Sequence, residues 1–289
     1  MTQDILISGL INGSVYALLA IGFSLVFGVA RIVNIAHTAF YMFAAYAIHT
    51  LFNNMGLSPL IAVPLAVVGV TALGMLAYKL IIERIREHET TVLIATIALA
   101  LVMQETMFII YGGHFRGNPN LVEGKMDILG VGITYQQLLT LGLVLVVLGG
   151  TWWMLMKSRL GNAIRATADD REIANLMGMN VNRIASLTIG ISVFLAAIGG
   201  AVVAPLRTVT PLMWLEPLVP VLAIVVLGGL GSLKGSFIAA YLIGFVETIT
   251  VFAFPEAAYL KGAMGLSIMV IVLLIRPEGL FGVVFEEER

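Results

Sequence analysis

Residues 157–183 read KSRLGNAIRATADDREIANLMGMNVNR, which is the longest charged segment in a chain that is otherwise mostly apolar. Long apolar runs stand on both sides of it. The chain of 289 residues is 60% hydrophobic and 11% charged, with a mean hydropathy of +1.01, whereas a soluble domain carries about 25% charged residues. The composition therefore predicts an integral membrane protein in which this charged segment lies outside the bilayer.

A helix needs about 20 apolar residues to cross a bilayer, and the chain holds nine candidate runs. They cover residues 5–29, 34–52, 59–81, 91–111, 136–156, 184–205, 217–230, 236–254 and 261–275. The seventh run is short and ends in glycines, so it is either a full crossing or a half-helix. The alternation typical of membrane strands is missing. The expected fold is all-α, a single transmembrane domain over residues 1–289 with eight to nine spans, broken helices and a short cytoplasmic helix in the charged segment.

Lysine and arginine gather on the cytoplasmic side of membrane proteins. If residues 157–183 are cytoplasmic, twelve of the 16 basic residues lie inside, Arg289 among them, and four lie outside. The outer four are Arg116, Lys125, Arg207 and Lys261. This bias predicts an external N-terminus and a cytoplasmic C-terminus, unless the seventh run fails to cross and reverses everything after it.

The middle of the charged segment, DDREIANLMG over residues 169–178, predicts a short helix. Asp169 is a suitable N-cap, and Glu172 three residues later completes a capping-box pattern. Gly178 supplies a left-handed stop at the other end. The segment is therefore expected to carry one short, well-defined helix on the cytoplasmic side.

This short helix has an apolar face, because Ile173, Leu176 and Met177 fall on one side of it. An exposed polar segment should not carry such a face unless another surface receives it. We expect a partner protein to bind here. The alternative is that the helix lies on the membrane surface.

Two stretches, residues 27–47 and 227–247, share one pattern. Each ends an apolar run with glycine, inserts a short polar break with one basic residue, and resumes as a helix rich in small residues. Paired interrupted spans often flank the substrate path of a transporter, since a broken helix exposes backbone groups. The pattern points to the two breaks as parts of such a path, with or without an internal repeat.

Polar groups inside membrane spans are costly and usually functional. Together with the breaks, this rule gives the candidate substrate-path residues Asn34, His37, Glu105, Gly228, Gly229, Gly231 and Glu247. For the two glutamates, the alternative role is a hydrogen bond that locks two helices together. For Asn34 and His37, it is capping of the helix that restarts after the break. No second ligand stands at metal spacing from His37, so no metal site is expected.

Four stretches resemble the permease subunits of branched-chain amino acid ABC importers. They are residues 161–183 (GNAIRATADDREIANLMGMNVNR), 12–37 (NGSVYALLAIGFSLVFGVARIVNIAH), 225–247 (VVLGGLGSLKGSFIAAYLIGFVE) and 276–282 (RPEGLFG). In the first, Glu172, Ala174 and Gly178 fit the E-A-A-x-x-x-G pattern of importer permeases, with Ile173 at the place of the middle alanine. The resemblance covers most of the chain in the family's order.

This resemblance implies a permease subunit that moves branched-chain amino acids or similar small solutes across a bacterial inner membrane. It also implies a second permease subunit, identical or homologous, two cytoplasmic ATP-binding subunits and an extracytoplasmic solute-binding protein. The residues expected to couple to the ATPase are Arg165, Asp169, Glu172, Ile173, Ala174, Leu176, Met177 and Gly178. The chain has no G-x-x-x-x-G-K-[ST] motif for binding ATP. We therefore expect it to bind no cofactor of its own and expect the partner ATP-binding subunits to use the ATP.

Two departures from the family leave the substrate open. Thr38 replaces a usual glycine, and residues 216–226 lack a usual lysine. Urea, short amides and aromatic acids therefore stay open as substrates, alongside the branched-chain amino acids.

A second class, an ion-coupled secondary transporter or channel, would use Glu105 and Glu247 as ion-linked carboxylates. Such a carrier has no use for an apolar coupling helix. Neither an enzyme nor a nucleic-acid binder is supported, because H-E-x-x-H, G-x-S-x-G and basic patches interleaved with aromatic residues are all missing.

Overall fold

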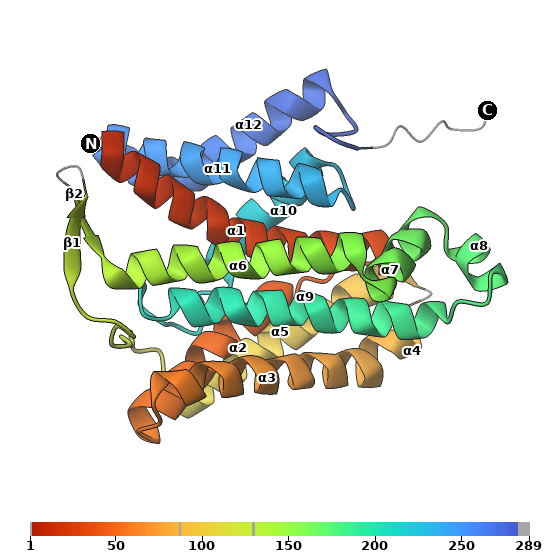
Figure 1. Cartoon of the computed structure of the whole chain (residues 1–289), viewed down its shortest axis with the longest axis horizontal. Coiled ribbons are helices and arrows are strands. Elements are labelled where there is room, and N and C mark those ends of the chain that lie inside the picture. Colours follow the sequence, from red (N-terminus) through yellow and green to blue (C-terminus); the bar gives the residue numbers. More distant parts are fainter. Residues whose placement is uncertain (1, 87, 129–130, 283–289) are drawn as a thin grey trace.

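The computed structural model describes residues 2–86, 88–128 and 131–282 (Figure 1). Over these residues, seven helical segments are long and apolar enough to cross a membrane. They are α1 (Thr2–Ala30), α3 (Pro59–Ala77) continued by the π-helical turn η2 (Tyr78–Ile82) and α4 (Glu83–Ile85), α5 (Glu89–Tyr111), α6 (Tyr135–Lys157), α9 (Val181–Val203), α11 (Leu233–Ala253), and the turn η3 (Pro255–Leu260) with α12 (Lys261–Ile275). The predicted polytopic helical bundle is confirmed.

The other two predicted spans form shorter helices. These are α2 (His37–His49), continued by the π-helical turn η1 (Thr50–Asn54), and α10 (Leu215–Gly228). α2 begins inside the bundle, because its first residue, His37, lies 3.0 Å from the Leu19 carbonyl oxygen in the middle of α1. α10 also begins inside, because Trp214 Nε1 donates to Gln104 Oε1 of α5 at 2.9 Å. Both spans are therefore broken. The part of each crossing that precedes the helix is made by non-helical chain, before His37 in one span and before Leu215 in the other.

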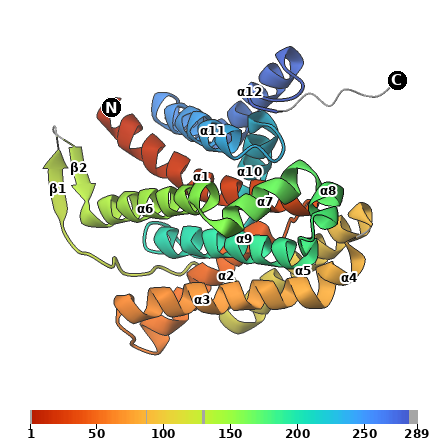
Figure 2. The same cartoon turned by 45° about the vertical axis from the view of Figure 1, so that its right-hand side comes forward.

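The charged segment 157–183 forms two helices, α7 (Arg159–Asp169) and α8 (Arg171–Leu176). Figures 1 and 2 show α4, α7 and α8 at one end of the bundle. The start of α1 and the antiparallel hairpin of β1 (Lys125–Ile128) and β2 (Val131–Thr134) lie at the opposite end. The segments predicted to be cytoplasmic thus share one end, which we call the coupling end; Arg289 lies outside the described residues.

The seventh predicted run reaches the coupling end from inside the bundle. Near its start, Glu216 accepts a hydrogen bond from Lys261 at 2.7 Å, and both residues line a cavity together with Asn12 of α1. At its end, the Gly228 carbonyl oxygen accepts from Phe281 N at 3.1 Å, and the adjoining Gly231 packs against Gly28 near the end of α1. The run therefore forms a short helix that begins inside the bundle, as the half-helix alternative expects. The chain does not return to the end at which α9 finishes, so the predicted reversal of the later segments is wrong.

α1 and α9 lie at the centre of the bundle. In the most apolar stretch of 18 residues, 89% of the residues are buried in α1 and 78% in α9, whereas only 6% are buried in the segment formed by η3 and α12. Glycines allow close backbone approach here. A Cβ on Gly244 of α11 would lie 2.6 Å from Gly13 Cα of α1, and one on Gly200 of α9 would clash with the Tyr41 carbonyl oxygen of α2. Small residues are used for this approach because helix packing in lipid depends on close contact.

Candidate functional site

α8 begins one residue later than the sequence predicts. Asp170 is its N-cap: one carboxylate oxygen accepts from Glu172 N at 2.8 Å and from Ile173 N at 2.9 Å. Asp169 is instead the last residue of α7. The predicted capping box of Asp169 with Glu172 is therefore wrong, because the helical turn before α8 includes Asp169 and the chain becomes extended only at Asp170.

The predicted apolar face of α8 is exposed in the structure. Leu176 is 85% exposed and Met177 is 77% exposed, and Ile173 also faces outward. Ala174 is buried on the other side. Gly178 has φ +84°, which confirms it as the left-handed stop of this helix. α8 therefore presents a small apolar surface beyond the end of the bundle.

Contacts hold α7 and α8 to the end of α1. Arg171 of α8 donates to the Ala30 carbonyl oxygen at 3.4 Å, and Arg31 donates to the Ala168 carbonyl oxygen at 3.3 Å. Arg165 of α7 donates to Asn162 Oδ1 of its own helix at 2.7 Å. A displacement of α8 would therefore act on α1 through these contacts.

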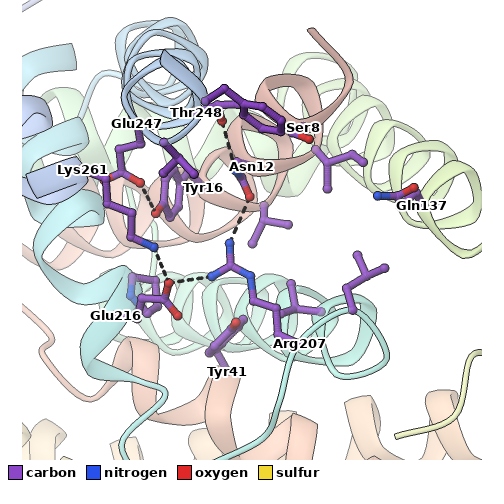
Figure 3. A pocket seen from close by; sticks show the side chains of 17 residues that line it. Ser8, Asn12, Tyr16, Tyr41, Gln137, Arg207, Glu216, Glu247, Thr248 and Lys261 are labelled. Atoms are coloured by element: carbon purple, nitrogen blue, oxygen red, sulfur yellow. Dashed lines mark hydrogen bonds and ion pairs between the residues drawn. The ribbon is translucent and has the colours of Figure 1, made fainter. Parts of the chain in front are cut away.

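At the opposite end, a cavity of about 330 Å³ opens between α1, α10, α11, α12 and the segment after α9 (Figure 3). Its polar lining residues are Ser8, Asn12, Tyr16, Tyr41, Gln137, Arg207, Glu216, Glu247, Thr248 and Lys261. Its remaining lining residues are apolar: Ile11, Val15, Val203, Leu206, Pro217, Val251 and Phe252. We call this space the outer cavity.

Two cations share one carboxylate in the outer cavity. Arg207 Nη1 lies 2.9 Å and Lys261 Nζ 2.7 Å from the same Glu216 oxygen. The second Arg207 amino group donates to Asn12 Oδ1 at 3.0 Å, and Asn12 donates to Thr248 Oγ1 at 3.1 Å. Burial lowers the pKa of Arg207, but the neighbouring Tyr41, Glu216 and Tyr16 outweigh burial and raise the pKa overall, so this side chain stays cationic.

Glu247, a predicted path residue, lines the outer cavity. Its Oε2 accepts from the Tyr16 hydroxyl at 2.7 Å, and its side chain is almost fully buried. This hydrogen bond also joins α11 to α1. The structure therefore shows the hydrogen bond that joins two helices and places Glu247 at a cavity wall, while its role on a substrate path stays a prediction.

His37 and Asn34 lie outside this cavity. His37 bridges three helices, with Nε2 near the Leu19 carbonyl oxygen and Nδ1 3.1 Å from Ser192 Oγ. The N-cap of α2 is Ala36, and no side chain caps it. Capping by Asn34 or His37 is therefore wrong, because the helix starts between packed helices where His37 itself occupies the first turn. Over the described residues, no group of three or more His, Cys, Asp or Glu side chains could hold a metal ion.

Glu105 is separated from Glu247. It lies on the exposed face of α5 and accepts from the neighbouring Gln104 at 3.2 Å. Gln104, rather than Glu105, turns into the bundle and binds Trp214. The structure therefore does not bring the two predicted glutamates into one site.

The three predicted glycines lie towards the coupling end. Gly228 is in close backbone contact with Gly235, while Gly229 and Gly231 have φ +97° and +82°. Gly231 also lines a second cavity of about 530 Å³, together with Ser24, Arg165 and Lys234. The break after α10 thus adjoins a space at the coupling end and not the outer cavity.

A family model described as "Branched-chain amino acid transport system / permease component" matches residues 5–273. The chain belongs to this permease family. The predicted family resemblance is therefore confirmed over almost the whole chain.

Two known permeases match this permease along nearly their full length. The high-affinity branched-chain amino acid transport system permease protein BraD of Pseudomonas aeruginosa is 29% identical, over 96% of this chain and 94% of BraD. The corresponding protein LivH of Escherichia coli K12 is 27% identical, over 95% and 94%. A solved structure, PsaBC from Streptococcus pneumoniae in complex with Fab, has a similar fold, with a TM-score of 0.55 and 17% identity over 95% of this chain and 92% of that chain.

Sequence reasoning missed most of the polar residues of the permease's outer cavity. Arg207 and Lys261 entered only as external charges, and Glu216 and Tyr16 were not singled out. The available signal was that Arg207, Glu216 and Lys261 each stand beside an apolar run on the predicted outer side. Their convergence on one cavity depends on how the helices pack, which the sequence does not state.

Proposed function

We propose that this permease is the membrane-spanning subunit of an ATP-driven importer in a bacterial inner membrane. Its cargo is a branched-chain amino acid or a similar small solute. The observation that carries this proposal is the exposed apolar face of α8, which is attached to the central helix of the bundle. The names of the relatives BraD and LivH support the substrate class.

The partners in this proposal are a second permease subunit, two cytoplasmic ATP-binding subunits and an extracytoplasmic solute-binding protein. ATP is bound by the ATP-binding subunits, since this chain has no P-loop motif. Leu176 and Met177 would insert into a groove of an ATP-binding subunit, as an apolar helix face does in other helix-in-groove contacts. The charged residues around them would set the orientation of the contact.

α1 provides a physical link between ATP use and the cargo path. The helix has 29 residues, so it is roughly 43 Å long at 1.5 Å per residue. Arg171 contacts its end at Ala30, while Asn12 in its first half and Tyr16 at its middle line the outer cavity. Closure of the ATP-binding subunits would favour one arrangement of α7 and α8, and α1 would carry that preference to the cavity as a shift between two bundle states.

The secondary-transporter alternative has less support. It needs two ion-linked carboxylates, and Glu105 lies on an exposed helix face away from Glu247. It also leaves the exposed face of α8 without a use.

Uptake into proteoliposomes tests the proposal. The purified complex is reconstituted with its binding protein, and entry of labelled L-leucine is measured with ATP, with a non-hydrolysable ATP analogue, and with a proton or sodium gradient alone. The proposal expects uptake only with hydrolysable ATP. Uptake driven by an ion gradient without ATP would overturn it.

A further inference from the structure

The outer cavity is neutral overall but has its charges separated. Arg207 and Lys261 contribute two positive charges, and Glu216 and Glu247 contribute two negative charges when both are ionised. Both cations are paired to Glu216, whereas Glu247 has a hydroxyl, that of Tyr16, as its partner (Figure 3). Adding net charge to a partly buried space is costly. A neutral ligand that carries one charge of each sign adds none, so it can enter this cavity without that cost.

The rest of the lining suits an aliphatic group. Ile11, Val15, Val203, Leu206 and Val251 line the same cavity. Its volume of about 330 Å³ falls within the range of roughly 300–1,000 Å³ found for small-molecule sites. An apolar lining with a few charged groups is the usual composition of such sites, where the charged groups fix the orientation of the ligand.

The ion pairs in the wall of the cavity can be exchanged. The side chains of Arg207 and Glu216 are 37% and 42% exposed, and ion pairs with this exposure contribute about 0–1 kcal/mol in proteins. A second carboxylate can therefore compete with Glu216 for the two cations. Arg207 is well suited to this exchange, because a guanidinium can bind a carboxylate through two parallel hydrogen bonds.

We propose that the outer cavity is a recognition site for the zwitterion of an aliphatic amino acid, whose carboxylate takes the place that Glu216 has beside Arg207 and Lys261 in the structure. The ligand's carboxylate binds Arg207 and Lys261 and displaces Glu216. Its ammonium group binds Glu247, and its side chain lies against the aliphatic lining. This inference rests on the proposed function, because it assigns a substrate class to the same permease.

The absence of cysteine from the whole sequence gives a direct test. Val251→Cys places one thiol in the cavity wall, and Val122→Cys places one at an exposed site before the hairpin as a control. The full permease complex in nanodiscs, without binding protein, is treated with N-ethylmaleimide. Labelling of this chain is timed with L-leucine, with 4-methylpentanoate, which lacks the ammonium group, or with 3-methylbutylamine, which lacks the carboxylate.

The expected result is that L-leucine slows labelling of Val251→Cys and leaves Val122→Cys unchanged, while neither analogue protects at the same concentration. Charge variants in the Val251→Cys background then separate recognition from folding. Glu247→Gln should weaken protection by L-leucine at least about tenfold and allow 4-methylpentanoate to protect. Arg207→Gln should weaken it similarly and allow 3-methylbutylamine to protect. Misfolding alone would not make one variant accept 4-methylpentanoate and the other accept 3-methylbutylamine.

Equal protection by all three compounds, or none by L-leucine, would overturn the inference, as would charge variants that keep the original preference. Glu256→Gln and Lys125→Gln, exposed residues near the same end, are the matched controls and should behave as the parent. ATP-dependent uptake of L-leucine by the unaltered complex is measured in parallel. Uptake without protection rejects the site alone, whereas no uptake rejects the proposed function.

Discussion

The Tyr16 hydroxyl on α1 donates a 2.7 Å hydrogen bond to Glu247 Oε2 on α11, inside the bundle and at the wall of the outer cavity. Tyr16 lies at the middle of α1, and Arg171 of α8 contacts the end of the same helix at Ala30. One rigid helix thus connects the proposed recognition site with the proposed contact for the ATP-binding subunit. Movements of α8 are expected to change the position of Tyr16 relative to Glu247.

Tyr16→Phe tests the structural part of this relationship. The variant leaves a buried carboxylate without its hydrogen-bond donor, so the free energy of unfolding should fall by about 1–3 kcal/mol. Thermal unfolding of the purified complex measures the change. Tyr259→Phe, at a residue that is 81% exposed, is the matched control and should unfold like the parent. Equal melting temperatures for the two variants would show that the Tyr16 hydrogen bond does not stabilise the bundle.

Gly200→Ala tests the packing of α9 against α2. The added methyl group would meet the Tyr41 carbonyl oxygen, and overpacking of this kind costs about 1–3 kcal/mol. Gly149→Ala in α6 is the control, because nothing lies within 4 Å of its added Cβ and alanine is the better helix former by about 1 kcal/mol. Size-exclusion profiles after heating should show loss of monodisperse protein for Gly200→Ala only. Similar profiles for both would contradict the close contact.

Asp170→Ala tests where α8 begins. Loss of this N-cap should cost about 1 kcal/mol of helix stability, and the loosened helix should reduce ATP-dependent uptake and binding of the ATP-binding subunits. Asp169→Ala removes an identical side chain one residue earlier, where it caps nothing in the structure. A larger effect of Asp169→Ala than of Asp170→Ala would favour the boundary that the sequence predicts.

The one-residue difference at α8 shows what the sequence could and could not predict. The apolar runs, the exposed face of Leu176 and Met177, and the stop at Gly178 follow from local patterns, and the structure has them all. The start of α8 depends on where α7 ends, and α7 was not predicted as a helix. Because Asp169 and Asp170 are equally good caps in isolation, only the preceding helix decides between them.

The two glutamates show a second limit. α5 and α11 are apolar on all sides, so hydrophobic periodicity does not indicate which face turns inward. Glu105 and Glu247 therefore look alike in the sequence, yet one is exposed and the other lines a cavity. The cavity itself joins distant parts of the chain, such as Asn12 and Thr248, which are 236 residues apart. Such convergence comes from helix packing and leaves no local signal.

The most direct test of the central claim is co-purification of the ATP-binding subunits with a permease carrying both Leu176→Asp and Met177→Asp. These changes place two charges on the exposed face of α8 and should abolish co-purification while membrane insertion remains normal. Met55→Asp, at a residue that is 67% exposed and lies between η1 and α3, is the control and should retain the subunits. Retention of the ATP-binding subunits by the double variant, at the level of the control, would contradict the claim that α8 is the coupling contact.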